Sequence, residues 1–205
     1  VDTSNPLLEK LKFLAITSSN LDEFFMIRVA GLKHQKENGV KRRDIANMTP
    51  TEQLENISDA CQKLVAQQYM HLKGILKELE TEGLVFIKPA DADERQKQWM
   101  GNYFEREIFP VVTPMAVDSS HPFPFLNIAM LLEKNERDEE MDEENDIDVK
   151  TAIVPVPSVL PRIIRLPDVS EANSRHCFVF LEDMLMFYAA RFFVGYDLLE
   201  ARAFR

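Results

Sequence analysis

A long helical repeat in the first half of the chain limits the folds that this sequence can adopt. Thr49 and Pro50 supply an N-cap and a first-turn proline before the repeat, and Gly83 supplies a C-cap after it. Between them, apolar residues recur every three or four positions, the spacing of one buried helical face. These residues are Leu54, Ile57, Cys61, Leu64, Val65, Leu72, Ile75, Leu76 and Leu79. The sequence therefore predicts a long amphipathic helix packed in a bundle.

A second helical region surrounds the motif from Ser18 to Arg28. Asn5-Pro6 opens an apolar-rich segment that ends at Ser18, and another such segment follows the motif's asparagine. Asn20 stands three residues before Glu23, a spacing at which a cap side chain and a carboxylate satisfy each other's backbone donors. We therefore predict two helices joined at Asn20. The second is too apolar to face solvent.

Two further elements complete the first part of the chain. The short run from Leu84 to Ile87 is bounded by Gly83 and Pro89, and it is too short for a helix. Asp91 and Glu94 repeat the capping pattern and open a helix that continues to about Phe109. Residues 1–108 are thus predicted to form an antiparallel bundle of three long helices plus the helix at the joint.

The sequence changes character after residue 108. Four prolines fall within residues 109–124, which disfavours a helix and predicts an extended connection at a domain boundary. Strands are predicted over 126–132, 151–156, 163–166 and 177–181, and a helix is predicted after Glu182. The predicted class is α+β, with a helical bundle over 1–108 and a partial α+β domain with a mostly antiparallel sheet over 109–205.

Charge is concentrated in one segment of the chain. The net charge is −10, and residues 133–150 contribute −7 of it through ten acidic and three basic side chains. We interpret this acidic loop as a solvated, hairpin-like excursion. The charge balance argues against nucleic acid as a partner, but a local basic patch could still bind phosphate. Lys41, Arg42 and Arg43 form such a patch, as a phosphate contact or as a solvated loop.

Several common chemistries lack their motifs. Cys61 and Cys177 stand far apart without a CxxC pattern, so neither a metal site nor a disulfide framework is predicted. The six glycines form no phosphate-binding loop. No acidic residue stands at a spacing typical of a catalytic pair from any of the four histidines, His34, His71, His121 and His176. No apolar run spans a bilayer and no signal pattern opens the chain, which favours a cytoplasmic location. The residues alone predict no complete active site and no catalytic residue.

Three blocks resemble the polyphosphate kinase family, which makes polyphosphate from ATP. Asn5 to Leu32 (NPLLEKLKFLAITSSNLDEFFMIRVAGL) closely resembles the family's opening segment. Phe109 to Leu126 (FPVVTPMAVDSSHPFPFL) looks like the start of its head domain, and Thr49 to Leu54 fits between them. The resemblance implies that residues 1–108 form the helical N-terminal domain and that 109–205 form about half of the head domain.

The resemblance also implies a reaction and a site residue. In the family, the ATP γ-phosphate passes to a histidine of phospholipase-D-like C-terminal domains and then to the growing chain, with Mg²⁺ bound by those domains. Asn20, in the motif SSNLDEF, is implied to contact the ATP base. Expected partners are ATP, polyphosphate, the protein's own C-terminal domains and further copies in a homo-oligomer. The 205 residues alone are expected to be inactive.

Two alternatives remain open at this stage. Asn20 could act only as a helix cap, or it could cap and bind ATP with different parts of its amide. The whole fragment could instead be an interaction or dimerisation module without a nucleotide role.

Overall fold

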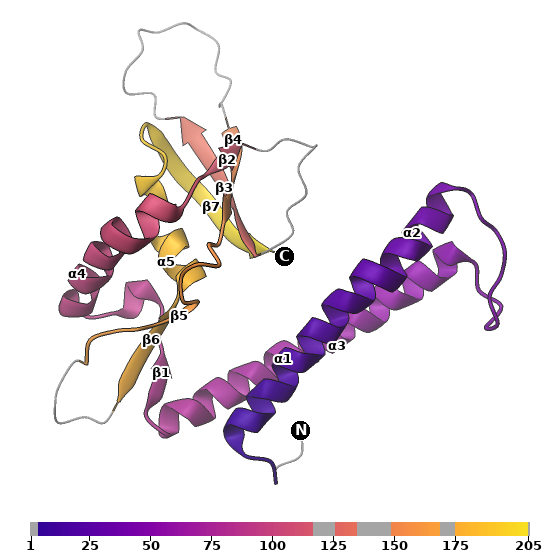
Figure 1. Cartoon of the computed structure of the whole chain (residues 1–205), viewed down its shortest axis with the longest axis horizontal. Coiled ribbons are helices and arrows are strands. Elements are labelled where there is room, and N and C mark those ends of the chain that lie inside the picture. The colour runs from indigo at the N-terminus through magenta and orange to yellow at the C-terminus, as the bar shows by residue number, and fades with distance from the viewer. Residues whose placement is uncertain (1–3, 117–125, 135–148, 169–174, 205) are drawn as a thin grey trace, which may run out of the picture. The chain divides into compact units, whose positions relative to one another are not determined.

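The computed structural model describes residues 4–116, 126–134, 149–168 and 175–204. The chain packs as two compact units, residues 1–82 and 83–205, and each is described by itself. Figure 1 shows the helices of the first unit and the mixed helices and strands of the second.

The first unit is an antiparallel helical hairpin. One arm contains α1 (Leu7–Phe24), the π-helical turn η1 (Phe25–Val29) and α2 (Ala30–Glu37), which follow one another without a break. The other arm is α3 (Pro50–Thr81), and it contacts both α1 and α2 (Figure 1). Lys10 in the first turns of α1 lies 3.8 Å from Glu78 near the end of α3, as expected for antiparallel arms.

The ends of α3 confirm the capping predictions. The Thr49 backbone N–H donates to the Glu52 carboxylate at 2.6 Å, and the Glu52 N–H donates to the Thr49 hydroxyl at 3.3 Å. The hydrogen bonds from Thr49 lower the pKa of Glu52, and the nearby Arg43 guanidinium adds to this effect. After α3, Gly83 adopts a φ of +84°, which favours glycine.

The predicted joint at Asn20 is wrong, because α1 runs through this residue from its start at Leu7. The spacing of Asn20 and Glu23 suggested a helix start, but the helix continues through both residues and through the hydroxyl residues before them. The Thr17 hydroxyl donates to the Phe13 carbonyl at 2.8 Å, so this polar group is satisfied within the helix. Packing of the apolar face against α3 then carries the helix onward, which is how tertiary contacts override local preference.

The second unit holds two sheets. The first has the order β1-β6-β5, with β1 (Leu84–Phe86) parallel to β6 (His176–Phe180) and β5 (Ile163–Arg165) antiparallel to β6. The second has the order β2-β4-β3-β7 and is antiparallel throughout. Its strands are β2 (Met115–Ala116), β4 (Val149–Pro155), β3 (Asn127–Lys134) and β7 (Tyr196–Phe204).

These sheets confirm the α+β class and the mostly antiparallel pairing. The four strands predicted after residue 125 are all present, as is the predicted helix, α5 (Leu181–Phe187). Strand β7 was not predicted. The antiparallel pair of Glu133 and Val149 brackets the acidic loop, and residues 135–148 of that loop lie outside the described residues.

The core of the second unit includes a helix that was predicted to join the bundle. Helix α4 (Glu94–Tyr103) continues into the π-helical turn η3 (Phe104–Ile108). Met100, Phe104 and Ile108 lie four residues apart, are fully buried, and share one cluster with Ile128 and Met130 of β3. Their spacing predicts a buried helical face but does not show whether a helix or a sheet covers it. The three-helix bundle is therefore wrong, because α4 packs in the second unit.

The division between the units also differs from the predicted boundary at 108/109. The packing divides between Glu82 and Gly83, since β1 pairs with β6 and α4 lies in the second core. After α4, the proline-rich stretch begins with a short 3₁₀ turn, η4 (Phe109–Val111), and reaches β2. Residues 117–125, including His121, lie outside the described residues.

Candidate functional site

Asn20 lies in the interior of α1 with its side chain exposed. It caps no helix, because Pro6 is the N-cap of α1, and its amide makes no hydrogen bond within the described part of the chain. An asparagine inside a helix costs up to about 0.7 kcal/mol relative to alanine. The cap-only alternative is therefore excluded, and local helix energetics do not explain this residue.

Apolar side chains flank Asn20 on the same face of the helix. Phe13, Ile16, Phe24 and Ile27 stand at spacings of three and four around it, and their exposed fractions are 56%, 45%, 36% and 66%. We call these four residues the outer stripe. The sequence predicted that the segment after Asn20 would avoid solvent, and this is wrong for Phe24 and Ile27. The outer stripe is therefore an exposed face with the composition of a buried one.

A different face of the same arm points toward α3. Leu21, Phe25 and Val29 line a groove of about 1090 Å³ together with residues of α3. The α3 residues are Leu54, Ile57, Ser58, Cys61, Gln62, Val65 and Ala66, and Lys33, Lys36 and Glu37 of α2 complete the lining. Asn20 does not line this groove. The two apolar faces of α1 are therefore distinct.

The wide turn η1 begins directly after the outer stripe's Phe24. Its N-terminal residue, Phe25, packs edge-on against Phe24, with ring centroids 6.1 Å apart and planes at 88°. Phe25 also lines the groove, so it connects the outer stripe to the interior of the hairpin. Single π-helical turns within α-helices occur frequently at functional sites.

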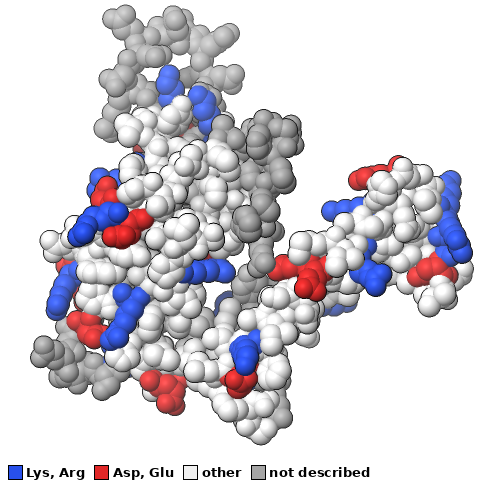
Figure 2. Space-filling model, in the orientation of Figure 1, with Lys and Arg blue, Asp and Glu red and all other residues white. Residues whose placement is uncertain are grey.

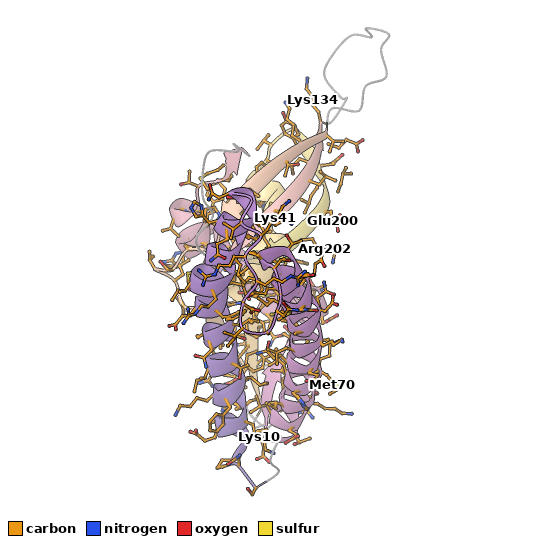
Figure 3. The ribbon with its side chains drawn as sticks, turned by 90° about the vertical axis from the view of Figure 1, so that its right-hand side faces the viewer. Lys10, Lys41, Met70, Lys134, Glu200 and Arg202 are labelled. Atoms are coloured by element: carbon orange, nitrogen blue, oxygen red, sulfur yellow. The ribbon has the colours of Figure 1, made fainter. Side chains whose placement is uncertain are left out.

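The predicted phosphate contact lies in the connection between α2 and α3. Arg43 donates to the Asn47 carbonyl and lies 3.3 Å from the Glu52 carboxylate, so it holds the connection onto the start of α3. Lys41 and Arg42 are exposed. Basic side chains mark this end of the unit in Figure 2, and Figure 3 places Lys41 at the opposite end from Lys10.

The structure does not bring the basic residues and Asn20 to one site. Asn20 precedes the end of α2 at Glu37 by 17 residues of helix. At 1.5 Å per residue, this is about 25 Å along the arm. The two predicted site elements are therefore separate features of the helical unit.

The second unit holds partly buried ion pairs, and at its surface His176 Nδ1 lies 2.9 Å from the Arg165 guanidinium and 3.5 Å from the Asp168 carboxylate. The Lys88 ammonium lies 2.7 Å from the Asp183 carboxylate, whose side chain is 7% exposed. Across the described ranges, no three histidine, cysteine, aspartate or glutamate side chains gather to hold a metal ion. Among the described helices, none is both long and apolar enough to cross a membrane.

The outer stripe is the feature that sequence reasoning missed. The sequence does contain the pattern that predicts it. One apolar repeat of α1 runs through Leu7, Leu11, Leu14 and Leu21, and the outer stripe is a second repeat on another face of the same helix. Treating the segment as two helices divided the second repeat at Asn20. A continuous helix would have placed this amide at the centre of an apolar face.

Comparisons with known proteins identify the family. A family model of the polyphosphate kinase N-terminal domain matches residues 1–87, and one of the polyphosphate kinase middle domain matches residues 95–205. A "Polyphosphate kinase" of Bacillus anthracis is 41% identical over 211 residues, covering 100% of this chain and 29% of the relative. A "Polyphosphate kinase 1" of Chlorobaculum tepidum is 39% identical over 206 residues, covering 98% of this chain and 29% of the relative.

A solved structure agrees with these matches. The crystal structure of polyphosphate kinase from Porphyromonas gingivalis aligns with a TM-score of 0.78 at 26% identity, covering 98% of this chain and 29% of that one. The chain thus spans about 29% of the length of the relatives that it matches. The resemblance of the three sequence blocks is confirmed, and the chain belongs to the polyphosphate kinase family, whose N-terminal and middle domains it matches.

Proposed function

We propose that the full-length protein is a polyphosphate kinase that transfers the ATP γ-phosphate to a growing polyphosphate chain. In this proposal, the helical unit helps to hold the ATP base through Asn20. The transfer itself, through a phosphohistidine, belongs to domains outside the 205 residues, and so does the Mg²⁺ that accompanies ATP. The observation that carries the role of Asn20 is its exposed amide at the centre of the outer stripe, which makes no hydrogen bond to any residue that the structure describes.

The chemistry of an amide suits an adenine base. Asparagine presents a donor and an acceptor side by side, and adenine presents a 6-amino donor beside a ring-nitrogen acceptor. An amide also adds no charge near the phosphates. Asn20 would therefore orient ATP and take no part in bond making, so its contribution is one of positioning.

The test is Asn20→Ala in the full-length enzyme, with steady-state kinetics at varied ATP concentration. We expect the KM for ATP to rise at least several-fold, while kcat and the unfolding temperature change little. Met70→Ala is a matched control, because Met70 is 61% exposed and lies on the outer side of α3 in Figure 3. An unchanged KM for ATP in the Asn20 variant would refute the proposed role.

The location of the chemistry has its own test. The purified 205-residue chain is expected to turn over no ATP, since the transfer is assigned to other domains. Polyphosphate synthesis by this chain alone, above that of a mock purification, would overturn the assignment.

The basic residues at the end of the helical unit form a separate proposal. We propose that Lys41 and Arg42 contact polyphosphate, with Arg43 contributing while it holds the connection onto α3. Charge reversal of Lys41 and Arg42 should weaken polyphosphate binding and reduce its salt dependence. Affinity that is indifferent to both reversals would remove this proposal.

A second candidate function is self-association through the second unit. Strand β7 is the outer strand of its sheet among the described strands, and an outer strand is where a further chain can add. We propose that this unit contributes to a homo-oligomer. Light scattering should detect concentration-dependent association of the 205-residue chain, and a strict monomer at high concentration would count against it.

A further inference from the structure

We infer that Phe24 is the platform on which the adenine base stacks while Asn20 contacts the edge of that base. This inference rests on the proposed role of Asn20. It adds a second residue to the site and separates two tasks, holding the base and reading its identity.

Position on the helix favours Phe24 over the other apolar residues beside Asn20. Phe24 and Ile16 each lie four residues from Asn20, the separation at which helical side chains are neighbours. Helical side chains lean toward the N-terminus. The Phe24 ring therefore leans over the turn that carries Asn20, whereas Ile16 leans away from it. Phe13 and Ile27 lie two turns from Asn20 and are outside the proposed site.

The ring of Phe24 has one aromatic neighbour and is partly exposed. Phe25 packs edge-on against it at 6.1 Å, and Phe25 is itself part of the groove lining inside the hairpin. The exposed 36% of Phe24 leaves apolar surface for a ligand. Phe25 is itself 42% exposed, so the two rings together offer aromatic surface on which a base can stack.

The chemistry of the outer stripe favours a base over a purely apolar occupant. An apolar segment that covered the stripe would bury the Asn20 amide without hydrogen bonds, at substantial cost. A purine covers Phe24 with an aromatic face and meets the amide with its polar edge. Aromatic stacking tolerates any base, whereas the amide distinguishes bases by their edge groups.

This separation of tasks gives a sharp experiment on the full-length enzyme. ATP is compared with purine riboside triphosphate, which keeps the purine ring and lacks the 6-amino group. Phe24→Ala should raise the KM of both nucleotides about five- to tenfold, the lower end of base stacking for a one-sided contact. The ratio of the two KM values should stay at its wild-type level, with kcat nearly unchanged.

Three further variants complete the set. Phe24→Tyr keeps the ring and should restore both KM values. Ile16→Ala, in the same stripe on the other side of Asn20, should leave them within about twofold of the wild type. Asn20→Ala should raise the KM for ATP, so that it approaches the KM for purine riboside triphosphate.

The outcomes separate this inference from the proposal on which it rests. A normal KM in Phe24→Ala, with a raised KM for ATP in Asn20→Ala, would overturn the stacking role and leave the role of Asn20 intact. A normal KM for ATP in Asn20→Ala would overturn the proposed function itself. A loss of kcat and of unfolding temperature in Phe24→Ala, without a rise in KM, would show a structural role and overturn the inference.

Discussion

Truncation of Phe104 tests the assignment of α4 to the second unit. Its side chain is fully buried, and its ring lies 4.8 Å from Tyr188, 5.3 Å from Phe192 and 6.2 Å from Phe109, measured between centroids. Phenylalanine-to-alanine changes in cores cost about 3–5 kcal/mol, because a cavity replaces the ring. Because Phe104 is fully buried and has three aromatic neighbours, we expect Phe104→Ala to lower the free energy of unfolding by about 4 kcal/mol.

Hydrogen exchange by mass spectrometry on the full-length protein locates this loss. A cost of about 4 kcal/mol lowers the protection of core amides by up to about a thousandfold. We expect the loss in β3 and α5, with protection of α3 unchanged. Phe104→Leu keeps most of the volume and should give a smaller loss in the same segments. Phe109→Ala is the control, because that ring is 42% exposed. Loss of protection in α1 and α3, with β3 unaffected, would refute the assignment of α4.

Three further changes test single interactions. Thr49→Ala removes the cap of α3 and should cost about 1 kcal/mol, seen as faster exchange in the first turn of that helix. Because the pKa of Glu52 is lowered in the folded chain, its stabilisation is present above the unfolded carboxyl pKa and is lost as the pH falls through the folded pKa. The protection of amides at that turn, taken relative to their intrinsic exchange rates, should therefore fall on acidification, and Glu52→Gln should flatten this pH dependence. Lys88→Met leaves the Asp183 carboxylate without its 2.7 Å partner and should destabilise the second unit by about 2 kcal/mol, and a change below 0.5 kcal/mol in chemical denaturation would contradict this. Tyr188→Phe removes the 3.2 Å hydrogen bond to the Lys97 carbonyl while keeping the ring, so about 1 kcal/mol is expected, and equal stability would show that the bond contributes nothing.

Local signals in the sequence predicted local structure well. The cap at Thr49 and the left-handed Gly83 just after α3 follow from backbone groups and nearby side chains, which the sequence contains directly. The same holds for the strands after residue 125, whose apolar runs are bounded by turn residues. Strand β7 was missed, because its strand conformation depends on pairing with β3, a partner more than 60 residues away.

The sequence-based predictions were wrong for helices whose apolar face could pack against more than one partner. The apolar spacing in α4 predicted a helix correctly, but only the assembled sheet shows that Phe104 packs against strands. At Asn20 the sequence offered a good helix cap, and packing along the whole of α1 overrode this local preference. The family resemblance pointed to Asn20 without this geometry, and the continuous helix supplies its apolar neighbours.

Photo-crosslinking tests the central claim most directly. The full-length enzyme is irradiated with 8-azidoadenosine triphosphate, digested, and analysed for labelled peptides by mass spectrometry. We expect label within residues 13–27 of α1 and η1, and we expect excess ATP to abolish it. Label that is competed by ATP but confined to peptides outside the helical unit would contradict the claim that Asn20 and Phe24 hold the base.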